Sequence, residues 1–495
     1  MHTTESEGFT DWFECASQGR KLIRGDDFMA DVWKHGTGLG DVRLDERAAM
    51  MFEQMVATHS VVLKKLGGKR AGEIGAGRLL ASEKANADSL LAPHFARTAE
   101  AVRGRRIVAP QDTTEINFAG RDKRRRGLGP AGDGVSKGFF IHPVLAVDAE
   151  DEAVLGVVAA EIWTRDEAPT PDRHGRAFAD KESARWLRGA VHAAERLGAA
   201  AHVTVVGDRE SDIFEVFAGK PDGIDYIIRA NHDRKLAGGA TLFQTTAGFA
   251  ELGCAHVKVA SKGIGDKGRT ARVVIKAGRV ELPAPKRPKL ANGEPAATGP
   301  STVTLGIVEV VEVVQDARLR HDAPAGVTPL LWRLTTTLPV DSLADACEII
   351  RLYRLRWRIE EVFRTLKKDG MRLEETQVVE ASAVMNLAAL ALAAAARIVQ
   401  LVDARDGSTR PASDVVDPGE IEAIAAISAS REGGTTRQQN PWPKGSLPWL
   451  SWVVARLGGW NCYGKKPGPK TMADGWHRLS AMLDGFRLAN ATKDV

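Results

Sequence analysis

The sequence predicts a mixed α/β fold built on a five-stranded sheet, with helical segments before and after it. From residue 106 onward, short β-branched runs appear in the order of three strands, a helix, a strand and another helix. A strand-rich stretch follows at about 221–335, and helical periodicity marks both ends of the chain. This order of elements fits a mixed sheet covered by helices.

The changes of pattern divide the chain into three expected domains. Residues 1–100 read as a helical N-terminal domain, residues 101–402 as the α/β domain, and residues 403–495 as a helical C-terminal domain. The strand-rich stretch at about 221–335 is expected to be a β domain inserted into the α/β domain. Its last run, PLLWRLTTT, could instead return to the main sheet as the fifth strand.

Composition indicates an ordinary globular protein. Apolar residues make up 43% and charged residues 27% of the 495 residues, and the net charge is +4. This charge is too small to establish a nucleic-acid partner, so local clusters must do so. Four scattered cysteines favour reduced thiols in the cytoplasm, and the polar N-terminus predicts no signal peptide. The alanine-rich run 383–401 is expected to be a buried bundle helix rather than a membrane span.

Two of the predicted strands end on aspartates. The run from Arg106 ends on Asp112, and the strands predicted at 138–148 and 153–163 should complete an antiparallel meander with it. After a helix at 180–197, the fourth strand, HVTVVGD, ends on Asp208. In a mixed sheet the first and fourth strands can lie side by side, which would bring the two carboxylates to one edge. Three nearby acids are expected to face solvent instead: Glu210, Asp212 and Glu361.

A helix predicted from Tyr353 to Lys368 carries two different stripes. Its apolar stripe, which we expect to be buried, consists of Leu352, Leu355, Ile359, Val362, Phe363 and Leu366. Its second stripe consists of Tyr353, Arg356, Glu360 and Lys367. Solvated ion pairs explain this second stripe as well as a functional site does. Cations outnumber the one aligned acid, however, and a carboxylate among cations could bind a metal ion beside phosphates.

Basic residues also gather near the N-terminus. A helix is predicted from Met50 to Leu66, with Arg43 and Arg47 one turn apart before it and a Gly-rich loop carrying Lys69 and Arg70 after it. Such pairs are usually a solvated face. The functional alternative is a small helical module that contacts DNA phosphates.

Asp112, Asp208 and Glu360 together suggest metal-dependent chemistry. Hard divalent cations such as Mg²⁺ prefer carboxylate oxygens. Two such ions a few Å apart can activate a water or hydroxyl and stabilise the leaving oxygen of a phosphodiester. This chemistry requires acids from different elements to converge.

Three motifs resemble those of a known family. They are DTT at 112–114, GDRESDI at 207–213, and the Y-x2-R-x3-E-x6-K spacing that starts at Tyr353. Together they resemble the DDE transposases of bacterial insertion sequences, specifically the IS-four family with its YREK signature. The resemblance covers nearly the full chain, and its spacing favours Glu360 over Glu361.

The resemblance implies an RNase H-like, retroviral integrase-like fold and a metal-binding triad of Asp112, Asp208 and Glu360. Two Mg²⁺ ions would bind there, with Mn²⁺ as a substitute. The expected DNA contacts are Tyr353, Arg356, Lys367, Trp332, Arg209, Arg229, Arg43, Arg47, Lys69 and Arg70. Trp332 would stack on a base flipped out beside the cleavage site; alternatively, it is a core residue of its strand.

The resemblance also implies partners and a reaction. The partners would be double-stranded DNA, as terminal inverted repeats and as target, and a second copy of the chain in a synaptic homodimer. The N-terminal domain would recognise the ends and the C-terminal domain would dimerise. The reaction would be cut-and-paste transposition through a 3′ nick, a hairpin, hairpin opening and strand transfer. We expect a bacterial, nucleoid-associated protein with no membrane partner. Two rival functions are a non-catalytic regulator that occupies the ends and a general RNase H-like nuclease or resolvase.

Overall fold

The computed structural model describes residues 39–119, 124–132, 134–166, 176–259, 269–285, 299–313, 329–367, 371–464 and 466–491. In these ranges, eleven strands form one mixed sheet. The strands are β1 (Arg106–Pro110), β2 (Thr114–Asn117), β3 (Gly129–Pro130), β4 (Lys137–Asp148), β5 (Val154–Trp163), β6 (His202–Gly207), β7 (Ile224–Arg229), β8 (Glu251–Val259), β9 (Arg269–Pro283), β10 (Thr302–Glu312) and β11 (Leu331–Thr336).

The sheet has parallel pairing only at its centre, within the described strands. The main order is β2-β4-β1-β6-β7-β11-β10-β9-β8, and β3 and β5 pair with β4. Strand β6 is parallel to both β1 and β7, and the other pairs are antiparallel. The predicted meander is confirmed, since β4 lies between β1 and β5. The predicted neighbourhood of the first and fourth strands is also confirmed.

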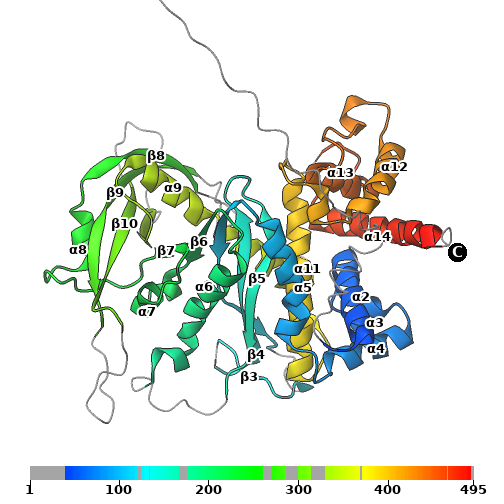
Figure 1. Ribbon diagram of the computed structural model, residues 1–495, viewed down its shortest axis with the longest axis horizontal. Helices are drawn as coiled ribbons and strands as arrows, with labels where there is room; N and C mark the ends of the chain where they lie inside the picture. Colours follow the sequence, from blue (N-terminus) through cyan, green and yellow to red (C-terminus); the bar gives the residue numbers. More distant parts are fainter. Residues whose placement is uncertain are drawn as a thin grey trace, which may run out of the picture.

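The expected five-stranded sheet is wrong, because the strand-rich stretch continues the sheet. Strand β7 lies in the stretch expected to form the insertion, yet it pairs with β6. Strand β11 pairs with β7 on one side and with β10 on the other. Figure 1 shows β8, β9 and β10 extending from the central strands. Strand β11 does return to the main sheet, and it links both parts by backbone hydrogen bonds. The boundaries of the three expected domains stay a prediction.

Helices cover both faces of the central strands. They are α2 (Val42–Thr58), α3 (Leu63–Gly67), α4 (Arg70–Leu80), α5 (Ala87–Ala101), α6 (Arg185–Arg196), α7 (Phe214–Ala218), α8 (Leu242–Ala247), α9 (Leu343–Arg354), α10 (Trp357–Lys367), α11 (Ala381–Ala404), α12 (Ile421–Arg431), α13 (Leu447–Leu457) and α14 (Pro469–Ala491). One core cluster joins the sheet to α6 and α7, and a second joins it to α9, α10 and α11.

The side-chain alternation of the central strands decides which residues face which layer. In β1, Ile107 and Ala109 belong to the core under α6, whereas Val108 belongs to the core under α9–α11. In β6, Val205 faces the α6 layer and Val206 faces the α9–α11 layer. Side chains alternate along a strand, so every second residue counted on from Val108 or Val206 points toward α10.

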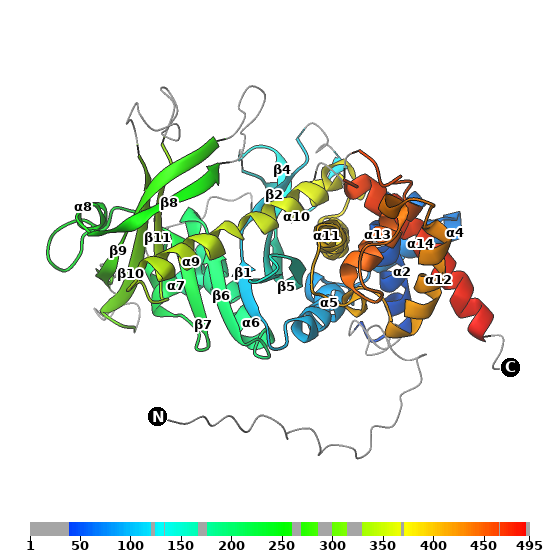
Figure 2. The same ribbon diagram turned by 90° about the horizontal axis from the view of Figure 1, so that it is seen from above.

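The predicted helix from Tyr353 to Lys368 is two helices in line. Helix α9 ends at Arg354 and α10 begins at Trp357, so Tyr353 and Glu360 belong to different helices. Between them the backbone hydrogen bonds span three residues, as in a 3₁₀ helix. The N–H of Arg356 donates to the carbonyl of Tyr353, and the N–H of Ile359 donates to the carbonyl of Arg356. The two helices run almost end to end across the sheet in Figure 2. The apolar stripe is buried as predicted.

The N-terminal helices differ from the prediction in their boundaries. The expected helix Met50–Leu66 is replaced by α2 and α3, because His59 adopts a left-handed conformation with φ of 47° and ends α2. The expected Gly-rich loop at Lys69 and Arg70 is instead the start of α4. The predicted helix at 180–197 begins only at Arg185, after short 3₁₀ turns.

Helix α11 is the central core helix of the helical part. It is long and apolar enough to cross a membrane by length and composition, yet 89% of its most apolar window is buried inside the protein. Helices α2, α5, α10, α13 and α14 all contact it. It is thus the buried bundle helix that the sequence predicts. Trp449, Trp452 and Trp476 are buried in the same core.

Candidate active site

Asp112 and Asp208 lie at the same level of two neighbouring parallel strands. Pro110 of β1 pairs in register with Val206 of β6, and each aspartate stands two residues further on. Asp112 shares the parity of Val108, and Asp208 that of Val206, so both carboxylates are directed toward the layer of α10. The structure therefore brings together the two strand-end aspartates that the sequence singled out.

A tight turn presents Asp208. Its Oδ1 accepts a hydrogen bond from the Glu210 N–H at 2.8 Å and so caps the 3₁₀ turn Arg209–Ser211. Gly207 permits this turn, because a Cβ there would lie 2.2 Å from the Ser211 Oγ. The Ser211 hydroxyl in turn donates to the Asp208 carbonyl at 2.7 Å.

Glu360 reaches the same place from α10, and Arg356 joins it to Asp112. The Arg356 Nη1 lies 2.8 Å from the Asp112 Oδ2 and 3.5 Å from the Glu360 Oε1. The Arg356 side chain is only 13% exposed, and its Nε is buried with no hydrogen-bond partner. A cation thus already lies between two of the three carboxylates.

Aromatic and basic side chains surround Arg356. Tyr353 is buried, and its ring contacts that of Trp332 with centroids 5.6 Å apart. Arg229 lies beside Tyr353, where burial lowers the pKa of the Arg229 guanidinium. The Arg229 Nη2 donates to the Leu331 carbonyl at 3.1 Å, next to Trp332. The structure therefore gathers these predicted DNA contacts around the carboxylates.

The electrostatics of the site favour a proton on Asp112. Burial raises the pKa of Asp112 to about 7, and the negative charge of Asp208 acts in the same direction. The Arg356 guanidinium and the Thr113 N–H, which donates to the Asp112 Oδ1 at 2.7 Å, oppose this shift. The two aspartates therefore interact strongly, and a bound cation would relieve their repulsion.

Of two other predicted DNA contacts, Arg209 is free to reach a phosphate and Lys367 is engaged within the protein. Arg209 is exposed at the rim, beside Asp208. Lys367 instead folds back onto the sheet, where its Nζ donates to the Glu115 carbonyl at 2.7 Å and lies 3.5 Å from Glu374. A phosphate contact by Lys367 would have to compete with these two partners.

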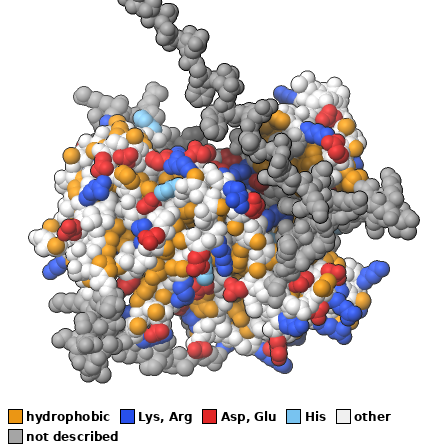
Figure 3. Space-filling model, viewed as in Figure 1, with side chains coloured by type: hydrophobic (Ala, Val, Ile, Leu, Met, Phe, Trp, Pro, Cys, Tyr) orange, Lys and Arg blue, Asp and Glu red, His pale blue; other side chains and the backbone are white. Residues whose placement is uncertain are grey.

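The predicted N-terminal DNA contacts lie apart, on α2 and at the start of α4. Arg43, Lys69 and Arg70 are exposed, and Arg70 pairs with Glu73 at 2.8 Å. Arg47 is partly buried and packs over Gly75 of α4. Lys and Arg side chains gather over these helices at the lower right of Figure 3.

One of the acids expected to face solvent is buried. Asp212 is 1% exposed, since it accepts hydrogen bonds from the backbone N–H groups of Asn231 and His232 and pairs with Arg234 at 2.8 Å. It anchors the loop after β7 and is compensated as a buried charge requires. Glu210 is exposed as predicted. Glu361 is half-buried and pairs with Arg358 at 2.9 Å, away from the two aspartates.

Sequence reasoning missed two side chains that support the site, His142 of β4 and Arg185 at the start of α6. The Thr113 hydroxyl lies 2.9 Å from the His142 Nδ1 and accepts from the Arg185 Nε at 2.9 Å. The available signal was a lone histidine inside an otherwise apolar strand, GFFIHPVLAVD.

The fold and the site define a class of α/β protein. Its central parallel strands and the helix that covers them bring carboxylates and cations together at the C-terminal ends of these strands. The family model described as Transposase DDE domain matches residues 137–396, more than half of the chain. The chain belongs to this family. It is therefore a DNA transposase, an enzyme that binds DNA and cuts and joins its strands. The matched range contains Asp208 and Glu360 and begins after Asp112.

The donor set fits the divalent metal ions that DDE transposases generally use. Asp112, Asp208 and Glu360 offer only carboxylate oxygens, the ligands that hard cations prefer. Within the described ranges, however, no three acidic, histidine or cysteine side chains are grouped closely enough to hold an ion. Arg356 lies between two of these carboxylates, with its Nη1 2.8 Å from the Asp112 Oδ2 and 3.5 Å from the Glu360 Oε1.

Proposed function

We propose that this transposase cuts and joins DNA through Asp112, Asp208 and Glu360, and that it belongs to the IS-four family, close to the Tn-five transposase. The observation that carries the proposal is that Arg356 pairs with both Asp112 and Glu360, while Asp208 lies at the level of Asp112 on the neighbouring strand and acts on its charge. The YREK spacing supports the subfamily, because Tyr353, Arg356 and Glu360 share one site.

The three carboxylates would hold two Mg²⁺ ions, with Mn²⁺ as a substitute. These ions, when bound, activate the attacking oxygen and stabilise the leaving oxygen of a phosphodiester. The chain itself positions the DNA. Arg356 and Arg229 would grip phosphates flanking the scissile bond, and Arg209 would do so from the rim. Trp332 would stack on a flipped base, for which its partly buried ring against Tyr353 gives a rigid platform.

The same site would serve each step of cut-and-paste transposition. One strand is cut to free a 3′ hydroxyl, this hydroxyl attacks the opposite strand to form a hairpin, the hairpin is opened, and the 3′ ends join target DNA. The basic N-terminal helices would recognise the terminal inverted repeats. The C-terminal helices would hold the synaptic homodimer on the bacterial nucleoid.

The test uses the purified full chain with a linear fragment that carries the element's ends. With Mg²⁺ we expect nicks at the ends and then hairpins, and much slower cutting of unrelated DNA. Tight end binding without nicking would identify a regulator that occupies the ends. Equally fast cutting of unrelated DNA would identify a general nuclease or resolvase. Either result would overturn the proposal.

A further inference from the structure

A buried network of hydrogen bonds holds Gln111 and Thr113, the residues before and after Asp112. His142 of β4 is 1% exposed and lies on the α6 side of the sheet. Its Nδ1 is 2.9 Å from the Thr113 hydroxyl, and its Nε2 is 3.2 Å from the Gln111 Oε1. The residues before and after Asp112 are thus tied to a single imidazole, while the Asp112 carboxylate points to the opposite face.

Each hydrogen bond of this network can be assigned a donor and an acceptor. The Gln111 Oε1 can only accept, so the His142 Nε2 that faces it carries the imidazole proton. In the neutral ring the Nδ1 then accepts from the Thr113 hydroxyl, which itself accepts from the Arg185 Nε. The Gln111 Nε2 donates to the Trp186 carbonyl at 3.1 Å. Burial, together with the charge of Arg185, holds the pKa of His142 well below its usual range and keeps this neutral form.

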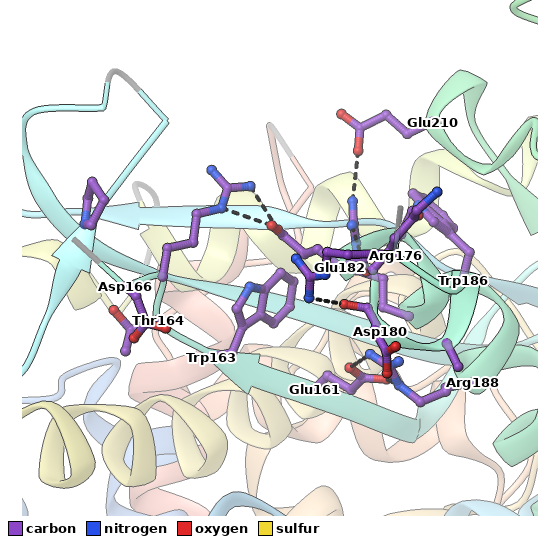
Figure 4. A pocket seen from close by; sticks show the side chains of 16 residues that line it. Glu161, Trp163, Thr164, Asp166, Arg176, Asp180, Glu182, Trp186, Arg188 and Glu210 are labelled. Carbon is purple, nitrogen blue, oxygen red and sulfur yellow. Dashed lines mark hydrogen bonds and ion pairs between the residues drawn. The ribbon is translucent and has the colours of Figure 1, made fainter. Parts of the chain in front are cut away.

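Arg185 also reaches the loop that carries Asp208. Its Nη2 donates to the Glu210 Oε2 at 2.9 Å, and the Glu210 N–H donates to the Asp208 carboxylate. Figure 4 shows this hydrogen bond as the dashed line from Glu210, in a pocket that Trp163, Glu182 and Glu210 help to line. The Arg185 guanidinium lies over the rings of Trp163 and Trp186, with its Cζ 5.7 and 5.4 Å from their centroids. One arginine therefore connects the two aspartate-bearing loops.

The residues packed around this hydrogen-bond network leave space for its side chains. Gly189 of α6 faces Gln111, and a Cβ at that position would lie 2.5 Å from the Gln111 Oε1. The rings of Trp186 and His142 pack in a T-shaped arrangement with centroids 4.7 Å apart. His142 binds the residues on either side of Asp112, so the network reaches Asp112 through the backbone of residues 111–113.

We infer that Arg185, Thr113 and His142 are positioning residues, which fix the backbone that carries Asp112 relative to Asp208 so that both carboxylates can share metal ions. This inference rests on the proposed function of the two aspartates. Outer partners that orient metal ligands commonly contribute 10- to 100-fold, about 1.4–2.7 kcal/mol, to metal affinity or activity. A carboxylate on a loop needs such support more than one on a helix, since the loop has no backbone ladder of its own.

The test replaces Thr113 by valine, which keeps its shape and removes the hydroxyl, with Thr113→Ser as the matched control. Mn²⁺ binding to the complex of the full chain with end DNA is followed by electron paramagnetic resonance. We expect Thr113→Val to weaken Mn²⁺ binding about tenfold with unchanged DNA affinity, and Thr113→Ser to stay within about twofold of wild type. Unchanged Mn²⁺ binding by Thr113→Val would overturn the inference, as would equal losses in both variants.

A second variant covers failure of Thr113→Val to fold. Arg185→Lys keeps the charge but cannot donate to Thr113 and Glu210 together, so it should weaken Mn²⁺ binding similarly; wild-type binding would refute the inference. Asp112→Asn separates this inference from the proposed function. If Asp112→Asn binds Mn²⁺ like wild type, Asp112 is not a ligand and the proposed function fails. If only Asp112→Asn loses Mn²⁺, the positioning role alone fails.

Discussion

The guanidinium of Arg356 lies 2.8 Å from the carboxylate of Asp112 and so takes a place that a metal ion would need. Because the same Nη1 is 3.5 Å from Glu360, Arg356 neutralises two candidate ligands at once. The Arg356 Nε is buried and has no hydrogen-bond partner. If Arg356 moves to the DNA phosphate proposed above, it releases Asp112 and Glu360, so metal binding and DNA binding should favour each other.

Removing the Arg356 charge should strengthen metal binding in the absence of DNA. Arg356→Gln takes away the cation that competes for Asp112 and Glu360, and we expect Mn²⁺ to bind about tenfold more tightly in calorimetry. The control is Arg354→Gln, which removes the same charge from an exposed position at the end of α9. An Mn²⁺ affinity that rises no more in Arg356→Gln than in this control would contradict direct competition.

The same substitution should weaken DNA binding in a salt-dependent manner. Loss of one phosphate contact lowers the log–log salt slope of end binding by about one unit. Fluorescence anisotropy between low and moderate salt measures this slope. A variant with the wild-type slope would show that Arg356 does not contact a phosphate.

The raised pKa of Asp112 predicts that ionising this carboxyl lowers the stability of the folded protein. This pKa is about 7 in the folded protein and near 3.8 in the unfolded chain, so the stability that the neutral carboxyl contributes is lost as pH rises through about 4 to 7. Metal-free Asp112→Asn, which stays neutral, should therefore be more stable than wild type at pH 8, by the order of 4 kcal/mol, and nearly equal at pH 4. Urea unfolding at both pH values measures the difference; a gain that is larger at pH 4 would refute the assignment.

The buried stripe of α10 should couple stability to catalysis. Ile359 is fully buried next to Glu360, and Ile359→Ala should cost about 2–4 kcal/mol and slow cutting by letting α10 shift. Leu479→Ala, in the equally buried core of α14, should cost similar stability without slowing the cut. Urea unfolding and single-turnover cleavage at a temperature where both variants are folded provide the comparison. Equal cleavage rates would disprove the coupling.

Local patterns were enough to predict the parts of the site that depend on single strands and helices. The apolar runs before Asp112 and Asp208 predicted both strand ends, and the order of elements allowed β1 and β6 to lie side by side, as they do. The apolar face of α10 predicted its docking side, because one face of a regular helix repeats every 3.6 residues. These features are encoded by neighbouring residues.

Features that depend on distant pairing were not predictable in this way. The continuation of the sheet through β11 requires hydrogen bonds between strands far apart in sequence. The burial of Asp212 depends on Arg234 and on a loop about 20 residues later. The break between α9 and α10 contains no Gly or Pro, so tertiary packing overrides a strong helical propensity there. Likewise, no local pattern shows that Arg356 lies between Asp112 and Glu360.

The identity of the third carboxylate is best tested on two adjacent glutamates. Glu360 lies beside Arg356 and Asp112, whereas Glu361 pairs with Arg358 on another side of α10. Single-turnover cleavage of end-bearing DNA with Mg²⁺ should fall at least about a hundredfold in Glu360→Gln and stay near wild type in Glu361→Gln, with both variants binding the ends. Normal cleavage by Glu360→Gln, or an equal loss in both variants, would contradict the assignment of Asp112, Asp208 and Glu360 as the catalytic carboxylates.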